Sequence, residues 1–132
     1  MATVSFHDLK VYQLAEQLCD AVWDIVRTWP PLARDTVGKQ IVRSADSIGA
    51  NIAEGSGRGS YADNKRFVRI ARGSLYETKH WLRRAYTRKL LTPEQTVSLR
   101  PLVDRLGPIL NSYLRSIGKQ VSAGEPPSTP PE

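Results

Sequence analysis

Residues 47–60 read SIGANIAEGSGRGS, and this stretch decides how the chain folds. Its first half carries Ile48 and Ile52 at helical spacing, and its second half has glycine at positions 55, 57 and 59. Glycine-rich loops can cradle phosphate, but a phosphate loop follows a strand and runs through a Gly-Lys-Ser or Gly-Lys-Thr sequence into a helix. Here no strand signal precedes the glycines and no such lysine follows them. The stretch therefore predicts a turn that ends one helix and lets Ser60 cap the next.

Helical periodicity continues on both sides of this turn and predicts four helices, at about residues 6–28, 35–54, 61–89 and 93–117. The paired prolines after Trp29 stop the first helix. Ser60 starts the third, and Thr92 with Gln95 starts the fourth as a capping box. We expect Gly107-Pro108 to kink the fourth helix without ending it, because the apolar pattern resumes in register. Four amphipathic helices with short connections predict an all-α fold, an antiparallel up-down-up-down four-helix bundle.

The chain has 132 residues, which is the size of one domain. We expect the bundle to occupy residues 1–118 and the Pro/Ser-rich residues 119–132 to form a disordered tail. No segment has the length and apolar character of a membrane span, and the N-terminus lacks the layout of a secretory signal. Cys19 is the only cysteine, which suits a reducing compartment and predicts a cytoplasmic protein with an inert buried thiol.

The positive charge of the chain is concentrated in one segment. The whole chain carries a formal net charge of +6, whereas residues 58–89 hold ten basic residues against two acidic ones, a net +8. A single basic segment on a nearly neutral body points to an anionic partner, with nucleic acid as the first candidate.

Most of this charge falls on one face of the predicted third helix. At 100° per residue, four cations lie within about 40° of Lys65, and the five form the predicted nucleic-acid-binding set: Lys65, Arg69, Arg72, Lys79 and Arg83. Small and apolar residues gather on the other side and are expected to face the core: Phe67, Ala71, Ser74, Leu75, Thr78, Leu82 and Ala85. Arginine predominates among the cations, and its planar donor fork suits phosphate oxygens. Tyr61 and Tyr76 can add stacking on exposed bases.

Two other interpretations of this face stay open. A charged helix face is most often simply solvated, although a solvated face usually mixes both signs. The face can also meet an acidic protein, in which case the molecule is an oligomeric scaffold without a nucleic-acid role.

Two further groups of residues have a structural interpretation. The tryptophans at positions 23, 29 and 81 are expected to be core or subunit-interface anchors. Asn51 and Glu54 do not follow from the apolar periodicity, and we expect them to make a polar contact near the helix end.

The residues do not favour an enzyme. His7 and His80 are the only histidines, and the single Glu77-x-x-His80 pair lies in a basic helix without the further glutamates that a di-iron bundle uses. No Ser-His-Asp or Cys-His grouping stands out. We therefore expect no catalytic residue, no metal site and no cofactor.

Several motifs taken together resemble a known family. They are Phe6-x-x-Leu9-x-Val11, Trp29-Pro30, Gln40-Ile41-x-Arg43-Ser44-Ala45, Ser47-Ile48-x-Ala50-Asn51-Ile52-Ala53-Glu54-Gly55 and Phe67-x-x-Ile70-Ala71-x-Gly73-Ser74-Leu75-x-Glu77. Over residues 6–117 the chain resembles the small four-helix bundle proteins encoded by intervening sequences in bacterial 23S ribosomal RNA genes. This family extends to the accessory variability protein of diversity-generating retroelements. Gly49 stands where the family often has proline.

The resemblance implies a bundle that assembles into a homopentameric ring. It also implies a basic protein whose retroelement relative binds nucleic acid and a reverse transcriptase. Together with the charge pattern, it leads to the hypothesis of a non-enzymatic, oligomeric protein that binds the backbone of RNA or DNA, with a possible adaptor role. The expected partners are further copies of the chain, RNA or DNA and a protein partner, and no membrane.

Overall fold

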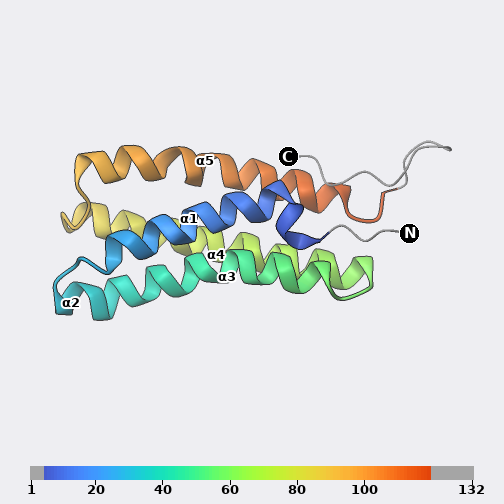
Figure 1. The fold of residues 1–132 in the computed structure, drawn as a ribbon, viewed down its shortest axis with the longest axis horizontal. Coiled ribbons are helices and arrows are strands. Elements are labelled where there is room, and N and C mark those ends of the chain that lie inside the picture. The colour runs from blue at the N-terminus through green and yellow to red at the C-terminus, as the bar shows by residue number, and fades with distance from the viewer. Residues whose placement is uncertain (1–4, 120–132) are drawn as a thin grey trace.

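The computed structural model describes residues 5–119, which are helical and contain no strand. The long helices lie side by side along the long axis of the molecule (Figure 1): α1 (Lys10–Val26), α3 (Lys39–Ser56), α4 (Tyr61–Thr87) and α5 (Pro93–Ser116). Three short elements complete them: the 3-10 turn η1 (Phe6–Asp8), α2 (Pro31–Ala33) and the π-helical turn η2 (Arg34–Gly38). The α1–α3 and α4–α5 connections lie at one end of the bundle, and the α3–α4 turn lies at the other (Figure 1).

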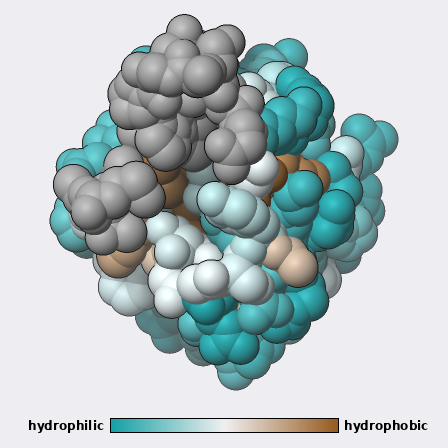
Figure 2. Space-filling view, turned by 90° about the vertical axis from the view of Figure 1, so that its right-hand side faces the viewer, coloured by the Kyte–Doolittle hydropathy of each residue, from teal (hydrophilic) through white to brown (hydrophobic). Residues whose placement is uncertain are grey.

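Each long helix packs against two others, so that four helices enclose one core. α1 and α4 each contact both α3 and α5. The contact between α3 and α4 is the most extensive, and that between α4 and α5 is much smaller. The largest fully buried side chains come from all four helices and include Leu18, Ile41, Ile48, Ile52, Leu75, Leu106 and Leu110. Seen from the α3–α4 end, the described surface is mostly hydrophilic, with apolar residues in small areas (Figure 2).

The predicted helix starts at Ser60 and Thr92 are confirmed by their hydrogen bonds. The hydroxyl of Ser60 accepts from the backbone N–H of Asp63 at 3.1 Å. At the start of α5, the hydroxyl of Thr92 accepts from the N–H of Gln95 at 3.1 Å, and the Gln95 side chain accepts from the N–H of Thr92 at 2.9 Å. These reciprocal bonds satisfy N–H groups that the first turn of a helix otherwise leaves unpaired. α5 then continues through Pro101 and Pro108 without ending.

The other helix boundaries differ from the predicted ones. Leu9 has an extended backbone (ψ 128°), so the first helix is a 3-10 turn followed by α1, which begins at Lys10 and ends at Val26. The second predicted helix begins earlier than residue 35. Pro31 occupies the first turn of α2, and the backbone stays helical through η2 into α3. The third ends at Thr87, just before Lys89 adopts a positive φ of 62°.

Gly55 does not end the second helix, contrary to the prediction. α3 continues to Ser56, Gly57 is its C-terminal cap, and Gly59 alone of the three glycines has a left-handed backbone, with φ of +82°. Gly55 is buried where α3 meets α4: a Cβ at this position would lie 2.7 Å from Asn64 Oδ1 and 2.9 Å from Phe67 Cβ. Its lack of a side chain is therefore what lets the two helices approach.

Gly55→Ala is expected to destabilise the protein by about 1–3 kcal/mol, because the added methyl group has no space and must displace α4. Urea unfolding followed by circular dichroism measures this change. Gly73→Ala is the matched control, because a Cβ at Gly73 in the middle of α4 would meet nothing within 4 Å. The control should be neutral or more stable by up to about 1 kcal/mol, since alanine favours a helix over glycine. Equal effects of the two substitutions would contradict the assigned close approach.

The buried face of α4 includes the predicted residues Ala71, Leu75, Thr78 and Ala85, and it is wider than predicted. Val68 is also completely buried, although it was not among the residues expected to face the core. Phe67 is only half-buried, and the guanidinium carbons of Arg58 and Arg66 lie 5.2 and 4.5 Å from its ring centre. The reason is that α4 packs against α5 as well as α3: Val68 lies one turn from Asn64 and from Arg72, which both form hydrogen bonds to α5.

The predicted tail at residues 119–132 lies outside the described residues, apart from Lys119, as do the first four residues of the predicted domain. Among the described helices, none is long and apolar enough to cross a membrane.

Candidate nucleic-acid interface

The five predicted cations all lie on α4, and together we call them the α4 stripe. Arg69, Lys79 and Arg83 are exposed, and Lys65 and Arg72 are half-buried. From Lys65 to Arg83 the stripe runs about 27 Å along the helix, at 1.5 Å per residue. The stripe lies away from the buried residues Ala71, Thr78 and Ala85, as the helical wheel predicted, and one edge of it borders α5.

The two carboxylates of this segment do not neutralise the stripe. Asp63 lies 3.7 Å from Arg66 and 3.9 Å from Arg58, both outside the stripe. Glu77 accepts a hydrogen bond from the indole N–H of Trp81 at 3.2 Å. Within residues 5–119, no stripe cation lies within 4.0 Å of a carboxylate oxygen. Among residues 5–119, the stripe is thus a row of cations without a carboxylate in ion-pair contact.

Arg72 connects the middle of the stripe to α5. Its guanidinium donates a hydrogen bond to the side-chain oxygen of Asn111 at 3.1 Å. This bond fixes the direction of the side chain and leaves its remaining N–H groups for an anion. Arg72 therefore contributes to the packing of α4 on α5 as well as to the charge of the stripe.

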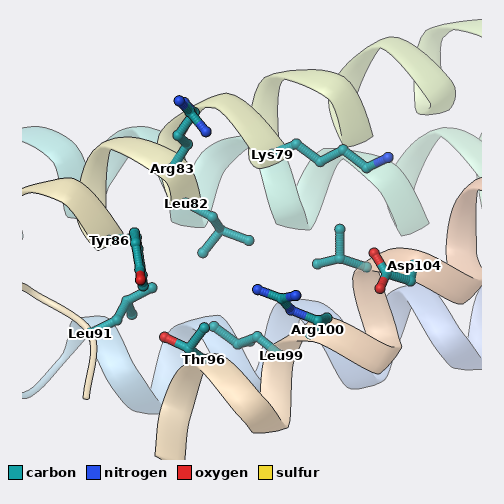
Figure 3. Close-up of a pocket in the computed structure, with 10 residues that line it drawn as sticks. Lys79, Leu82, Arg83, Tyr86, Leu91, Thr96, Leu99, Arg100 and Asp104 are labelled. Atoms are coloured by element: carbon teal, nitrogen blue, oxygen red, sulfur yellow. The ribbon is translucent and has the colours of Figure 1, made fainter. Parts of the chain in front are cut away.

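Toward the C-terminal end of α4, the stripe borders a groove between α4 and α5. The groove has a volume of about 500 Å³. Leu82, Leu91, Leu99 and Val103 give it apolar walls, and its polar lining residues are Lys79, Arg83, Tyr86, Thr96, Arg100 and Asp104. Leu82, Tyr86 and Arg100 project between the two helices, whereas the guanidinium of Arg83 points outward (Figure 3). We call this feature the α4/α5 groove.

Sequence reasoning missed Arg100 and Tyr86. Arg100 lies on α5, and its place beside Lys79 follows only from the way the two helices pack. Tyr86 follows Lys79 and Arg83 at spacings of seven and three residues, which is the helical signal that could have found it. Tyr86 is 61% exposed, so a large part of its ring is open to solvent.

The polar residues of the opening motif make contacts inside the chain. The side-chain NH2 of Asn51 donates to the backbone oxygen of Ser47 at 2.8 Å and lies 2.9 Å from its hydroxyl. The Ser47 hydroxyl lies 2.9 Å from that of Ser74 on α4. Glu54 lies 3.8 Å from Arg58. These contacts give Asn51 and Glu54 a structural role at the junction of α3 and α4.

The tryptophans differ in their surroundings. Trp29 is buried, as expected of a core anchor, and Trp81 is half-buried. Trp23 is 57% exposed and lines a second groove, between α1 and the start of α3, together with Lys39 and Arg43. Trp23 is therefore not a core residue of this chain.

Cys19 is half-buried, and its thiol is a weak acid. Burial, together with the nearby carboxylates of Asp46 and Asp20, raises its pKa to about 12. Because a thiolate is the reactive form, such a thiol is a poor nucleophile at neutral pH. Within the described part of the chain, no group of three or more His, Cys, Asp or Glu side chains could hold a metal ion.

Iodoacetamide at pH 8 is expected to alkylate Cys19 on the order of a hundredfold more slowly in the folded protein than in urea, where a cysteine pKa is about 8.5. The thiolate fraction is about 10³-fold smaller in the folded protein, and the greater nucleophilicity of a more basic thiolate offsets part of this difference. The folded rate should rise as pH increases toward 12, as the thiolate forms. Mass spectrometry of quenched samples gives both rates. Equal rates in the folded and unfolded protein would contradict the raised pKa.

The comparisons with known proteins agree with each other. Residues 7–112 match the model of the 23S rRNA-intervening sequence protein family. The chain matches no curated protein. A solved structure of a protein of unknown function from the S23 ribosomal protein family of Bacteroides thetaiotaomicron is 27% identical, with a TM-score of 0.71. That similarity covers 80% of this chain and 98% of the other.

Proposed function

The chain belongs to the 23S rRNA-intervening sequence protein family, as its motifs predicted, and on this premise we propose that it is a non-enzymatic, oligomeric protein that binds the backbone of RNA or DNA. The observation that carries the proposal is the α4 stripe, whose five cations have no carboxylate partner among the described residues. A row of cations without carboxylate partners attracts a polyanion such as a nucleic-acid backbone. Contacts to phosphates give affinity and little sequence preference, so the proposed binding is general.

We further propose that the protomer is an antiparallel up-down-up-down bundle and that five copies form a ring. The resemblance of the motifs to the four-helix bundle family supports both points. A ring presents five stripes, and contacts that are weak singly combine through effective concentration. Native mass spectrometry tests the assembly, which should have five times the mass of the 14.7 kDa protomer. A monomer or dimer at micromolar concentration would contradict the ring.

Binding across a salt series tests the proposed function. With all five stripe cations on phosphates, the logarithm of the affinity for duplex DNA should fall against the logarithm of salt with a slope of about −4.5 for each protomer engaged. Fluorescence anisotropy with a labelled duplex and a labelled RNA between 50 and 300 mM KCl measures this slope. Absence of binding at 50 mM KCl would overturn the proposal.

The alternative is a scaffold whose basic face binds an acidic protein. It predicts a partner that co-purifies at a fixed stoichiometry and competes with nucleic acid for the stripe. A complex of that kind, together with a nucleic-acid affinity no higher than that of an unrelated cationic protein of equal charge, would favour the scaffold.

A further inference from the structure

The α4/α5 groove differs in chemistry from the rest of the α4 stripe. Around Lys65 and Arg69 the stripe is an open row of cations, but at Lys79 and Arg83 it borders a hollow with apolar walls. A phosphate backbone gains no stabilisation from contact with apolar side chains. A ligand that fits the whole groove therefore has both an anionic and an apolar part.

Charge restricts the ligand further. Lys79, Arg83 and Arg100 lie at the groove against one carboxylate, that of Asp104. None of the three cations lies within 4.0 Å of a carboxylate oxygen within the described residues. The excess of positive charge favours a ligand that brings phosphate to the rim, in continuity with the phosphates proposed for the stripe.

The apolar part is best matched by a flat ring. Leu82 and Tyr86 project from α4 into the space that Leu99 and Val103 border from α5 (Figure 3). The ring of Tyr86 is largely open, and tyrosine is a common stacking platform for bases. The volume of about 500 Å³ is within the range of clefts that hold small organic ligands, so a nucleobase with its sugar fits.

We infer that the α4/α5 groove takes an unstacked nucleobase while the α4 stripe holds the flanking phosphates, so that the preferred ligand is single-stranded nucleic acid. This inference rests on the proposed function and narrows it. In a duplex the bases are paired and stacked inside the helix, and they cannot enter the groove. In a single strand they can turn outward and stack on an aromatic side chain.

A preference for single-stranded over duplex DNA distinguishes base binding in the groove from attraction by charge alone. Duplex DNA has the higher charge density, and cations alone therefore favour it. A groove that holds a base reverses this order. The probes are a 12-nucleotide single strand of mixed sequence and the same strand annealed to its complement, each labelled and measured at 150 mM KCl.

Tyr86→Leu removes the stacking surface and keeps an apolar side chain at an exposed position. We expect it to weaken binding of the single strand about tenfold, the effect of losing one stacked base, and to leave duplex binding and the salt slope unchanged. Tyr76→Leu is the matched comparison, because Tyr76 is similarly exposed, 63% against 61%, and does not line the groove. Its ring lies 5.4 Å from the ammonium of Lys79, so this variant tests whether an exposed tyrosine beside the stripe serves equally well. Thermal melts check that both variants are folded.

The outcomes distinguish the groove from the stripe. The inference is supported if the single strand binds more tightly than the duplex and loses affinity in Tyr86→Leu but not in Tyr76→Leu. A duplex that binds as tightly as the single strand, or a loss at Tyr76 in place of Tyr86, overturns it and leaves the proposed backbone binding intact. Absence of binding to both probes at 50 mM KCl as well as at 150 mM overturns the proposed function itself.

Discussion

Replacing Arg69, Lys79 and Arg83 together by glutamine is expected to weaken binding to duplex DNA by about 10²- to 10³-fold at 0.1 M salt. Each lost phosphate contact removes about 0.9 from the salt slope, so three contacts flatten it by about 2.7. All three side chains are exposed, and none forms an ion pair within the described residues, so the fold should not change. Arg72 is left in place because it donates to Asn111 and its loss would also disturb the packing of α5.

The matched control carries the same change of charge on other surfaces. Lys39, Arg43 and Arg115 are exposed, and they lie on α3 and α5, outside the stripe and the α4/α5 groove. Replacing all three by glutamine should reduce the affinity for DNA by less than about threefold, because only the overall positive potential of the protein is lowered. If the two triple variants lose the same affinity, net charge explains the binding and the stripe has no special role.

Leu18→Ala is expected to destabilise the protein by about 2–5 kcal/mol, because it leaves a cavity in a packed core. Leu18 is 0% exposed and belongs to the core that all four long helices enclose. A loss of this size is a large part of the stability of a small domain, so the variant should be partly unfolded at 37 °C. The free energy of unfolding from urea titrations gives the value.

Leu32→Ala is the control: it removes the same side-chain atoms from an exposed position, where no cavity forms. Leu32 is 80% exposed on α2, and its truncation should change the stability by no more than about 0.5 kcal/mol. A comparable loss at both positions would mean that α2 is covered in the folded protein, for instance by another copy of the chain.

Features that depend on nearby residues could be predicted from the sequence. Both helix caps, at Ser60 and Thr92, follow from residues three positions apart, and the stripe follows from the 3.6-residue period of one helix. The role of Gly55 was misjudged, because a buried glycine inside a helix and a glycine that ends one look the same in a sequence. Only the position of Asn64 and Phe67 on α4 distinguishes them.

Features that depend on how helices pack could not be predicted. Val68 is buried between Asn64 and Arg72, which both form hydrogen bonds to α5, and no local pattern indicates which neighbour a helix has. For the same reason the α4/α5 groove could not be predicted, because it combines Tyr86 of α4 with Arg100 of α5. Trp23 was expected to be a core or a subunit-interface anchor; its exposure excludes the core of this chain, and the subunit interface stays a prediction.

Hydrogen exchange with and without a 12-nucleotide single strand tests the central claim most directly, because it locates the contact on the chain. We expect slower amide exchange in α4 from Lys65 to Tyr86 and in the first three turns of α5, with α1 and α3 unchanged. Protection confined to α1 and α3, with none in α4, would contradict the α4 stripe as the binding surface.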